Sequence, residues 1–248
     1  MNYAKYLWHG IAFFIIFVIA TAPAQVLQSS FNKVKGLNVE GLSGSLWHGH
    51  ASQVIYNDIS LGQADWDLSG WSLILMRLSL DVSLKSEQSN LSSHLILQSS
   101  SVEAENLKAR FPAPWVSKLT KVPFQAQGQL FVRMKQAKIS NSGAPFLYGA
   151  LSWQDATLKT PFGKQAQLGT INVGLTTEEE WIVSDIKSSK GSMDLRATVR
   201  VNYPKEMAAK GSVSDQLSTE LHGFFSLFTK PDNEGRLVFD YKGGIPAL

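Results

Sequence analysis

Cysteine is absent from this chain of 248 residues. The absence excludes disulfide bonds, thiolate metal sites and cysteine nucleophiles, and it is compatible with an oxidising compartment. Charge is also scarce, because charged residues make up 17% of the chain against 44% hydrophobic residues, and the formal net charge is +3. This composition suits a folded protein with a hydrophobic core. A net charge this small, without Lys and Arg clustered among aromatic residues, argues against nucleic acid as a partner.

Signature motifs of several enzyme classes are missing as well. The sequence contains no Gly-rich phosphate loop, no nucleophile elbow and no HExxH zinc motif. We therefore expect a protein that is not an enzyme, with no catalytic residues, no metal site and no cofactor.

A continuous apolar segment covers Leu7–Ala24, whose 18 residues carry no charge apart from that of His9 when it is protonated. A helix of this length spans about 27 Å, close to the hydrocarbon thickness of a bilayer. We expect residues 1–28 to form an N-terminal membrane anchor or signal segment. Residues 29–248 would then form a β-rich domain outside the cytoplasm.

Two interpretations of the apolar segment remain open. A cleaved signal peptide would use Ala20-Thr21-Ala22 or Ala22-Pro23-Ala24 as its small-residue site. An uncleaved anchor would continue through Leu27 as a single-pass helix, with Trp8 at one interface. The apolar core is longer than that of a usual signal peptide, which favours the anchor. Both interpretations place Gln25 and the residues after it outside the cytoplasm.

From Val39 onward, apolar residues alternate with polar ones. The clearest runs are Met76–Leu84 and Met193–Tyr203, and shorter ones are Leu130–Met134, Ile171–Leu175 and Leu237–Tyr241. Alternation of this kind is typical of antiparallel strands with one dry face and one solvated face, and no βαβ rhythm is present. The sequence predicts a mainly β fold, either one large curved antiparallel sheet or a β-sandwich. One or two short helices would accompany it, after the single N-terminal transmembrane helix.

Two segments depart from this alternation. Glu103–Leu119 mixes helical spacing with Pro112 and Pro114, which predicts a short helix or turn. Ser214–Phe228 places Leu217, Leu221 and three phenylalanines on one helical stripe, which predicts a helix covering part of the sheet.

Two stretches repeat one pattern. Gly41–Leu68 and Gly149–Leu175 each contain a Trp, then a small residue, then a Leu-Gly pair that enters a new apolar run. The pairs are Leu61-Gly62 and Leu168-Gly169. The pattern indicates a meander in each stretch, and we expect a sheet built by near-duplication.

His48 and His50 place two imidazoles on one side of a strand, an arrangement that could chelate a metal. The other histidines, His9, His94 and His222, lie in unrelated segments, so a third ligand is hard to find. We therefore interpret the pair as exposed or turn histidines.

Asp65 and Asp67 place two carboxylates on one strand face, with Trp66 on the other. Paired carboxylates hydrolyse glycans when a cleft sets their separation. The simpler interpretation is two solvent-facing positions of a half-buried strand. Likewise, Glu178–Glu180 is most simply a solvated turn.

Seven tryptophans could suggest a carbohydrate platform. However, Trp47, Trp66 and Trp153 fall at apolar phases of the expected strands. Core packing is therefore the favoured interpretation of these three residues.

Taken in order, these features resemble protein N of the type II secretion system, the general secretion pathway protein N family. The resemblance is carried by the apolar segment ending at Ala24, by Gly41–Ala51, Leu61–Leu68 and Gly149–Ala156, by Leu168-Gly169, and by Lys230–Arg236 before a final strand. Phe224, Phe225 and Phe228 depart from the more leucine-rich stripe expected there, which affects local packing only. The resemblance implies a bitopic inner-membrane protein with a periplasmic β-rich domain, an accessory component of protein transport without catalytic residues.

Two hypotheses of function follow. In the first, the protein is a scaffold whose exposed sheet edge or apolar patch recruits other type II secretion subunits. In the second, the dry face of the sheet forms a trough that binds a lipid or another amphiphile. A glycan hydrolase would rest only on Asp65, Asp67 and the tryptophans.

Overall fold

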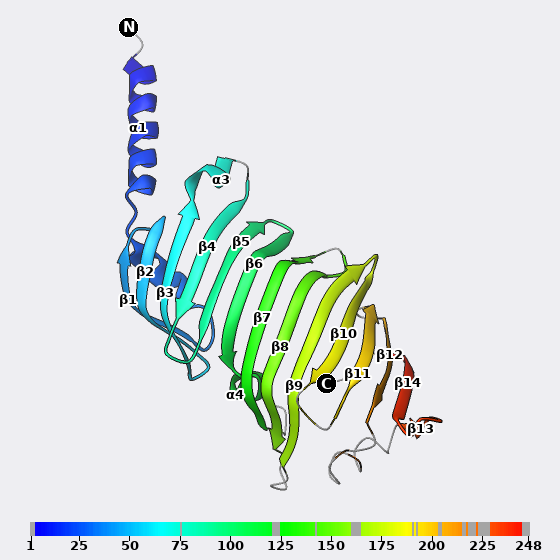
Figure 1. The fold of residues 1–248 in the computed structure, drawn as a ribbon. Helices are drawn as coiled ribbons and strands as arrows, with labels where there is room; N and C mark the ends of the chain where they lie inside the picture. The colour runs from blue at the N-terminus through cyan, green and yellow to red at the C-terminus, as the bar shows by residue number, and fades with distance from the viewer. Residues whose placement is uncertain are drawn as a thin grey trace. The chain divides into compact units, whose positions relative to one another are not determined.

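The computed structural model describes residues 3–74, 76–120, 125–141, 143–159, 165–189, 191, 193–202, 205–214, 217, 222 and 229–244 (Figure 1). The chain divides into two compact units, unit 1 (Met1–Glu87) and unit 2 (Gln88–Leu248). Each unit is built mainly from antiparallel strands joined in a meander.

Unit 1 begins with helical segments and continues as a four-stranded sheet in the order β1-β2-β3-β4. Its helical segments are α1 (Tyr3–Ala20), η1 (Ala24–Leu27), α2 (Gln28–Phe31) and α3 (Gly70–Ile74). Its strands are β1 (Leu37–Gly44), β2 (His48–Tyr56), β3 (Ile59–Ser69) and β4 (Leu78–Lys85). The two-residue connection between β2 and β3, Asn57-Asp58, has positive φ at both positions (46° and 62°), as a tight hairpin turn matched to the strand twist requires.

The core of unit 1 lies on one face of this sheet. Its buried members are small or β-branched residues from three strands: Val39, Ala51, Val54 and Ala64. Larger side chains, among them Phe31 and Trp66, pack against them while partly exposed. A sheet with one apolar face therefore underlies unit 1, as the alternation predicts.

The apolar N-terminal segment is helical, as expected, and forms α1. Its large side chains are exposed around the whole helix, for example Trp8 at 71%, Phe13 at 73% and Ile16 at 64%. Within the residues that the structure describes, no helix is long and apolar enough to span a membrane, which leaves the transmembrane prediction unsupported.

The described residues of unit 2 form ten strands in the order β5 to β12, then β14, then β13. The strands are β5 (Asn90–Gln98), β6 (Ser101–Pro112), β7 (Gln125–Ser140), β8 (Phe146–Lys159), β9 (Gln165–Glu178), β10 (Trp181–Ser189), β11 (Arg196–Asn202), β12 (Glu206–Val213), β13 (Lys230–Pro231) and β14 (Leu237–Gly243). One short helix, α4 (Pro114–Thr120), follows β6. In each unit the described strands lie in a single antiparallel layer, which confirms the mainly β prediction and its sheet alternative over the sandwich.

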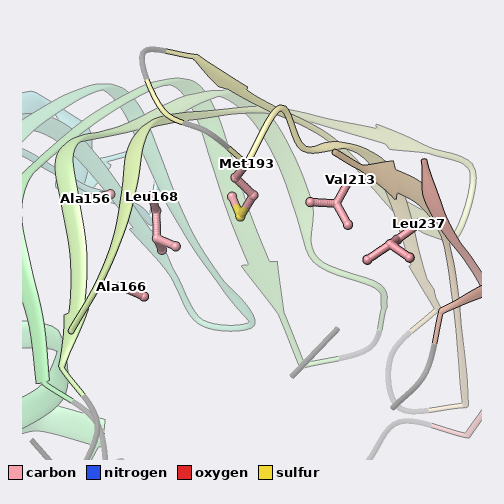
Figure 2. Packing of buried hydrophobic residues seen from close by; sticks show 6 residues of the cluster. All are labelled: Ala156, Ala166, Leu168, Met193, Val213 and Leu237. Carbon is pink, nitrogen blue, oxygen red and sulfur yellow. The ribbon is translucent and has the colours of Figure 1, made fainter. Parts of the chain in front are cut away.

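The main core cluster of unit 2 joins β8 and β9 to the last strands. Figure 2 shows Leu168, Met193, Val213 and Leu237 on the same side of the curving ribbon. Ala156 and Ala166 complete the buried set, and Trp153 packs against it. A second cluster, around Ala113, Ala126 and Leu130, lies beside Phe111 and also contacts Trp153.

The helix or turn predicted over Glu103–Leu119 is wrong for most of its length, because Ser101–Pro112 is strand β6. Asn106 interrupts the strand with a positive φ of 51°, and the pairing of β6 with β5 shifts there by one residue. This bulge breaks the two-residue period, so the segment loses the signature of a strand. Only Pro114–Thr120 is helical, with Pro114 at its first residue, a position that favours proline.

Two predicted strands begin later than expected. Met76 lies in a turn with φ of 53° and is 92% exposed, so β4 starts at Leu78. Met193 is buried in the loop before β11, which starts at Arg196. The shorter predicted runs all lie within strands β7, β9 and β14. Most of the predicted helix Ser214–Phe228 is outside the described residues, although Leu217 packs against the main cluster.

Candidate functional site

The segment Gly44–Gly49 connects β1 to β2 and holds the end of α1 against the sheet. Gly44 has φ of 80°, a conformation that turns the chain sharply after β1. The next residue, Ser45, forms a β-bridge with Pro23, and the Leu46 amide donates to the Ala22 carbonyl at 2.8 Å. The end of the N-terminal segment is thus joined to the sheet through backbone hydrogen bonds.

Trp47 adds a side-chain bond to this junction. Its indole N–H donates to the carbonyl of Ile19, near the end of α1, at 2.9 Å. Gly49 leaves room for the ring of Trp66, whose indole N–H donates to the Leu46 carbonyl at 3.1 Å. Trp66 packs in the core as expected, but Trp47 lies in the bend between strands, so its placement on a strand was wrong.

The outer edge of β1 is occupied by the segment that follows α1. The side-chain amide of Gln25 donates to the Leu42 carbonyl at 3.0 Å, and that of Gln28 donates to the Val39 carbonyl at 3.3 Å. Ala24, immediately before Gln25, is fully buried. Side chains that occupy edge carbonyls reduce the capacity of a strand to pair with another chain.

The structure brings together two pairs of residues that the sequence presents separately. His48 lies opposite Asp67 and His50 opposite Asp65 across β2 and β3. The Nδ1–Oδ1 distances are 3.4 Å for His48–Asp67 and 2.8 Å for His50–Asp65. Asp65 and Asp67 are more than half exposed, which confirms the solvent-facing interpretation.

The His–Asp ladder holds its two imidazoles and two carboxylates as separate pairs. No group of three potential ligands occurs among the residues that the structure covers. His9 lies in α1, His94 lies in β5, and His222 is exposed. The imidazoles of His48 and His50 each have a carboxylate partner, an arrangement that can stabilise an exposed strand pair modestly.

Glu178–Glu180 is exposed, as predicted: Glu178 ends β9, and Glu179 and Glu180 form the turn before β10. Glu179 has φ of 56°, and Glu180 lies 3.4 Å from the ammonium of Lys205. Trp153, the third tryptophan assigned to the core, packs against both clusters of unit 2 and donates to the Gln127 carbonyl at 2.9 Å.

Arg236 fastens the last hairpin of unit 2. Its guanidinium donates to the Asp194 carboxylate and to the Asp194 carbonyl, both at 2.7 Å, and to the Ser212 hydroxyl at 3.1 Å. The Arg236 hydrogen bond, aided by the nearby Arg196, lowers the pKa of the Asp194 carboxyl. The arginine of the Lys230–Arg236 motif is therefore a structural clamp.

A depression in the sheet surface lies over β6, β7 and β8. It has a volume of about 400 Å³ and is lined by Asn106, Leu107, Lys108, Arg133, Met134, Lys135, Tyr148, Gly149 and Ala150. Sequence reasoning missed it, because its cations are ordinary polar positions of three separate strands and only the strand register brings them together.

Comparison with known proteins decides the family. A family model described as type II secretion system (T2SS), protein N, matches residues 35–240. The chain belongs to this family. This match confirms the resemblance drawn from the motifs. The matched region contains the junction segment Gly44–Gly49, the depression and the Arg236 clamp.

Full-length relatives carry the same description. A type II secretion system protein N from Aeromonas hydrophila is 27% identical over 252 residues, covering 98% of this chain and 97% of the relative. The Vibrio cholerae protein N is 28% identical over 237 residues, covering 92% and 93%. The Pectobacterium carotovorum protein N is 19% identical over 234 residues, covering 93% and 92%. No solved structure matches the chain.

Proposed function

We propose that this member of the family is a non-catalytic accessory component of the type II secretion machinery. In this proposal, residues 1–28 anchor it in the bacterial inner membrane, and residues 29–248 present a periplasmic domain that contacts other secretion subunits. The observation that carries the proposal is the family match over residues 35–240, together with relatives named as protein N of this system.

The exposed surface of α1 supports an apolar environment for the N-terminal segment. Large apolar side chains such as Phe13, Phe17 and Ile19 would each be stabilised by about 1.5–3 kcal/mol on full removal from water. The junction through Ser45, Leu46 and Trp47 also joins α1 to the sheet directly. An anchor fastened in this way would hold the sheet close to the membrane.

The test is recovery of partners from intact membranes. Cells that express the tagged full chain in place of the native copy are crosslinked, the chain is purified, and the co-purifying proteins are identified by mass spectrometry. The proposal expects other type II secretion subunits among them and loss of substrate secretion when the gene is deleted. Repeated recovery of no secretion subunit, with secretion unaffected by deletion, contradicts it.

A second candidate function is binding of a lipid or another amphiphile by the apolar face. One row of residues in register across β7 to β11, made up of Val132, Leu151, Val173, Ile186 and Ala197, is only partly buried. An apolar row of this kind favours an apolar ligand. Lipid mass spectrometry of the purified full chain tests it, with bound lipid above the detergent background as the expected result.

The non-catalytic part of the proposal has its own test. Asp65 and Asp67 are the paired carboxylates nearest to a hydrolytic arrangement, and each has a histidine partner. We expect the double variant D65A/D67A to support secretion at the level of the unsubstituted chain. Loss of secretion in a variant that is folded and present at normal abundance contradicts this expectation.

A further inference from the structure

The depression over β6, β7 and β8 is built from a regular block of the sheet. Each strand contributes three consecutive residues, and Lys108, Arg133 and Ala150 stand in register across the block. Residues two apart on a strand share a face, so Lys108, Arg133, Tyr148 and Ala150 lie on one face of the block, with Ala150 at its β8 border. The exposure pattern agrees: these residues are exposed, whereas Leu107 and Met134 between them are half-buried and buried.

Two irregularities of the sheet meet at this block. Asn106 in β6 has a positive φ of 51°, where the pairing with β5 shifts register. On the adjacent strand, Lys135 falls where the pairing of β7 with β8 shifts, between Met134 and Gln136. Bulges re-aim side chains and concentrate next to functional sites. Here they place an amide and an ammonium group at the border of the same depression.

The charges around the depression are of one sign. Lys108, Arg133 and Lys135 line it, and no Asp or Glu is among the residues that line it. In the described part of the chain, none of these three cations forms an ion pair with a carboxylate. Lys135 instead lies over the ring of Tyr148, with its Nζ 5.1 Å from the ring centroid. Other cations of unit 2, such as Lys210 and Arg236, do have acidic partners.

We propose that this depression is a binding site for a phosphate-bearing ligand. Arg133 offers the planar donor pair that suits a phosphate, Lys108 and Lys135 offer point charges, and Asn106 and Tyr148 offer neutral donors. Three cations around one small depression suit the charge of a phosphate group better than that of a single carboxylate. Such a group could be the headgroup of an anionic lipid or a free small phosphate.

The site would add to the amphiphile-binding candidate above, but the two are tested separately. Co-purified lipid tests the apolar face, whereas the depression is tested by substitutions on the opposite, polar face. Co-purified lipid that is unchanged in R133Q/K135Q is assigned to the apolar face, and the depression is judged by the binding of soluble phosphate probes.

The experiment uses the full chain in a nonionic detergent and measures binding by phosphorus NMR line broadening. The probes are inorganic phosphate and glycerophosphoglycerol, the water-soluble headgroup of phosphatidylglycerol. R133Q/K135Q should weaken binding about tenfold or more, because it removes two charged hydrogen-bond donors. The matched control K159Q/K187Q removes the same charge from exposed lysines outside the depression and should bind like the unsubstituted chain.

A second variant keeps every charge. A150L places a larger side chain at the β8 border of the depression, beside Arg133, and should also weaken binding about tenfold if the depression holds the ligand. Tighter binding of glycerophosphoglycerol than of phosphate identifies a lipid headgroup as the source, and the reverse order identifies a free phosphate. The proposal is overturned if neither probe binds, or if R133Q/K135Q and A150L bind as well as the control.

Discussion

The stretches Gly41–Leu68 and Gly149–Leu175 have similar sequences but only half of the pattern has the same structure in both. Leu61-Gly62 and Leu168-Gly169 occupy equivalent positions, because Gly62 and Gly169 each lie where the pairing with the preceding strand shifts register. Their φ values, 86° and 78°, are nearly the same. The Leu-Gly half therefore builds the same bulge twice.

The tryptophan half of the two stretches differs. Trp153 lies inside β8 and packs against the core, whereas Trp47 lies in the bend after Gly44 and donates to the end of α1. Gly44 has a positive φ and turns the chain, whereas Gly149 lies within β8, which continues through it. The repeated motif thus forms the same bulge in both stretches. Its tryptophan differs, because Trp47 follows the turn at Gly44 and contacts α1, whereas Trp153 lies in the continuous strand β8 and packs in the core.

The largest effect is expected at the shared bulge. An alanine at Gly62 would adopt an unfavourable positive φ, and its Cβ would collide with the Lys85 carbonyl oxygen. We expect Gly62→Ala to lower the free energy of unfolding by about 3 kcal/mol, measured by chemical denaturation of the full chain in detergent. Gly169→Ala should also destabilise, by at least about 1 kcal/mol from the backbone alone. If neither substitution lowers the free energy of unfolding, the bulges do not require glycine for stability.

The tryptophans should separate the two regions. Trp47→Phe and Trp153→Phe each remove one indole donor, a bond worth about 1 kcal/mol. Trp47→Phe should increase amide hydrogen exchange around residues 19–23 and leave unit 2 unchanged, because its partner is the Ile19 carbonyl. Trp153→Phe should instead increase exchange in β7 and β8, since its partner is the Gln127 carbonyl. If both variants showed the same exchange pattern, the assignment of Trp47 to the end of α1 and of Trp153 to β7 and β8 would be contradicted.

A pH dependence is expected of the clamp in unit 2. The pKa of Asp194 is lowered in the folded chain by Arg236, so its contribution is fully present above its ordinary value of 3.8. The contribution is lost as pH falls through the lowered pKa of the folded chain. Because the Asp194 side chain is 42% exposed, we expect an effect below about 1 kcal/mol. Thermal unfolding between pH 6 and pH 3 should show a smaller acid-induced loss for D194N than for the unsubstituted chain.

The smallest effect is expected in the His–Asp ladder. A double-mutant cycle with H50Q and D65N should give a coupling free energy of about 0.2–1 kcal/mol, because both side chains are substantially exposed. Added salt should reduce the coupling. The cross-strand pair Ser152–Asn172 in the second stretch, joined at 2.8 Å, provides an uncharged control whose coupling should not depend on salt. Salt-independent coupling at His50–Asp65 would show that the pair is not ionic.

Sequence patterns predicted the strands where the two-residue period is unbroken and failed where a bulge interrupts it. The Leu-Gly pairs, the turn at Glu178–Glu180 and the positions of Asp65 and Asp67 follow from local chemistry alone. The strand that contains Asn106 could not be predicted, because the bulge at this residue breaks the two-residue period of the sequence. The partners of Trp47 and the grouping of Lys108, Arg133 and Lys135 depend on which residues face each other across strands, and a single sequence does not specify that register.

The most direct test of the central claim is secretion supported by tethered and untethered forms of the chain. In cells that lack the native copy, residues 1–20 are replaced either by an unrelated apolar anchor or by a cleavable signal peptide, and secretion of a type II substrate is measured. The account predicts that the anchored form restores secretion and that the released form, at equal periplasmic abundance, does not. Equal secretion with both forms, or normal secretion with neither, would contradict the role of a membrane-held component.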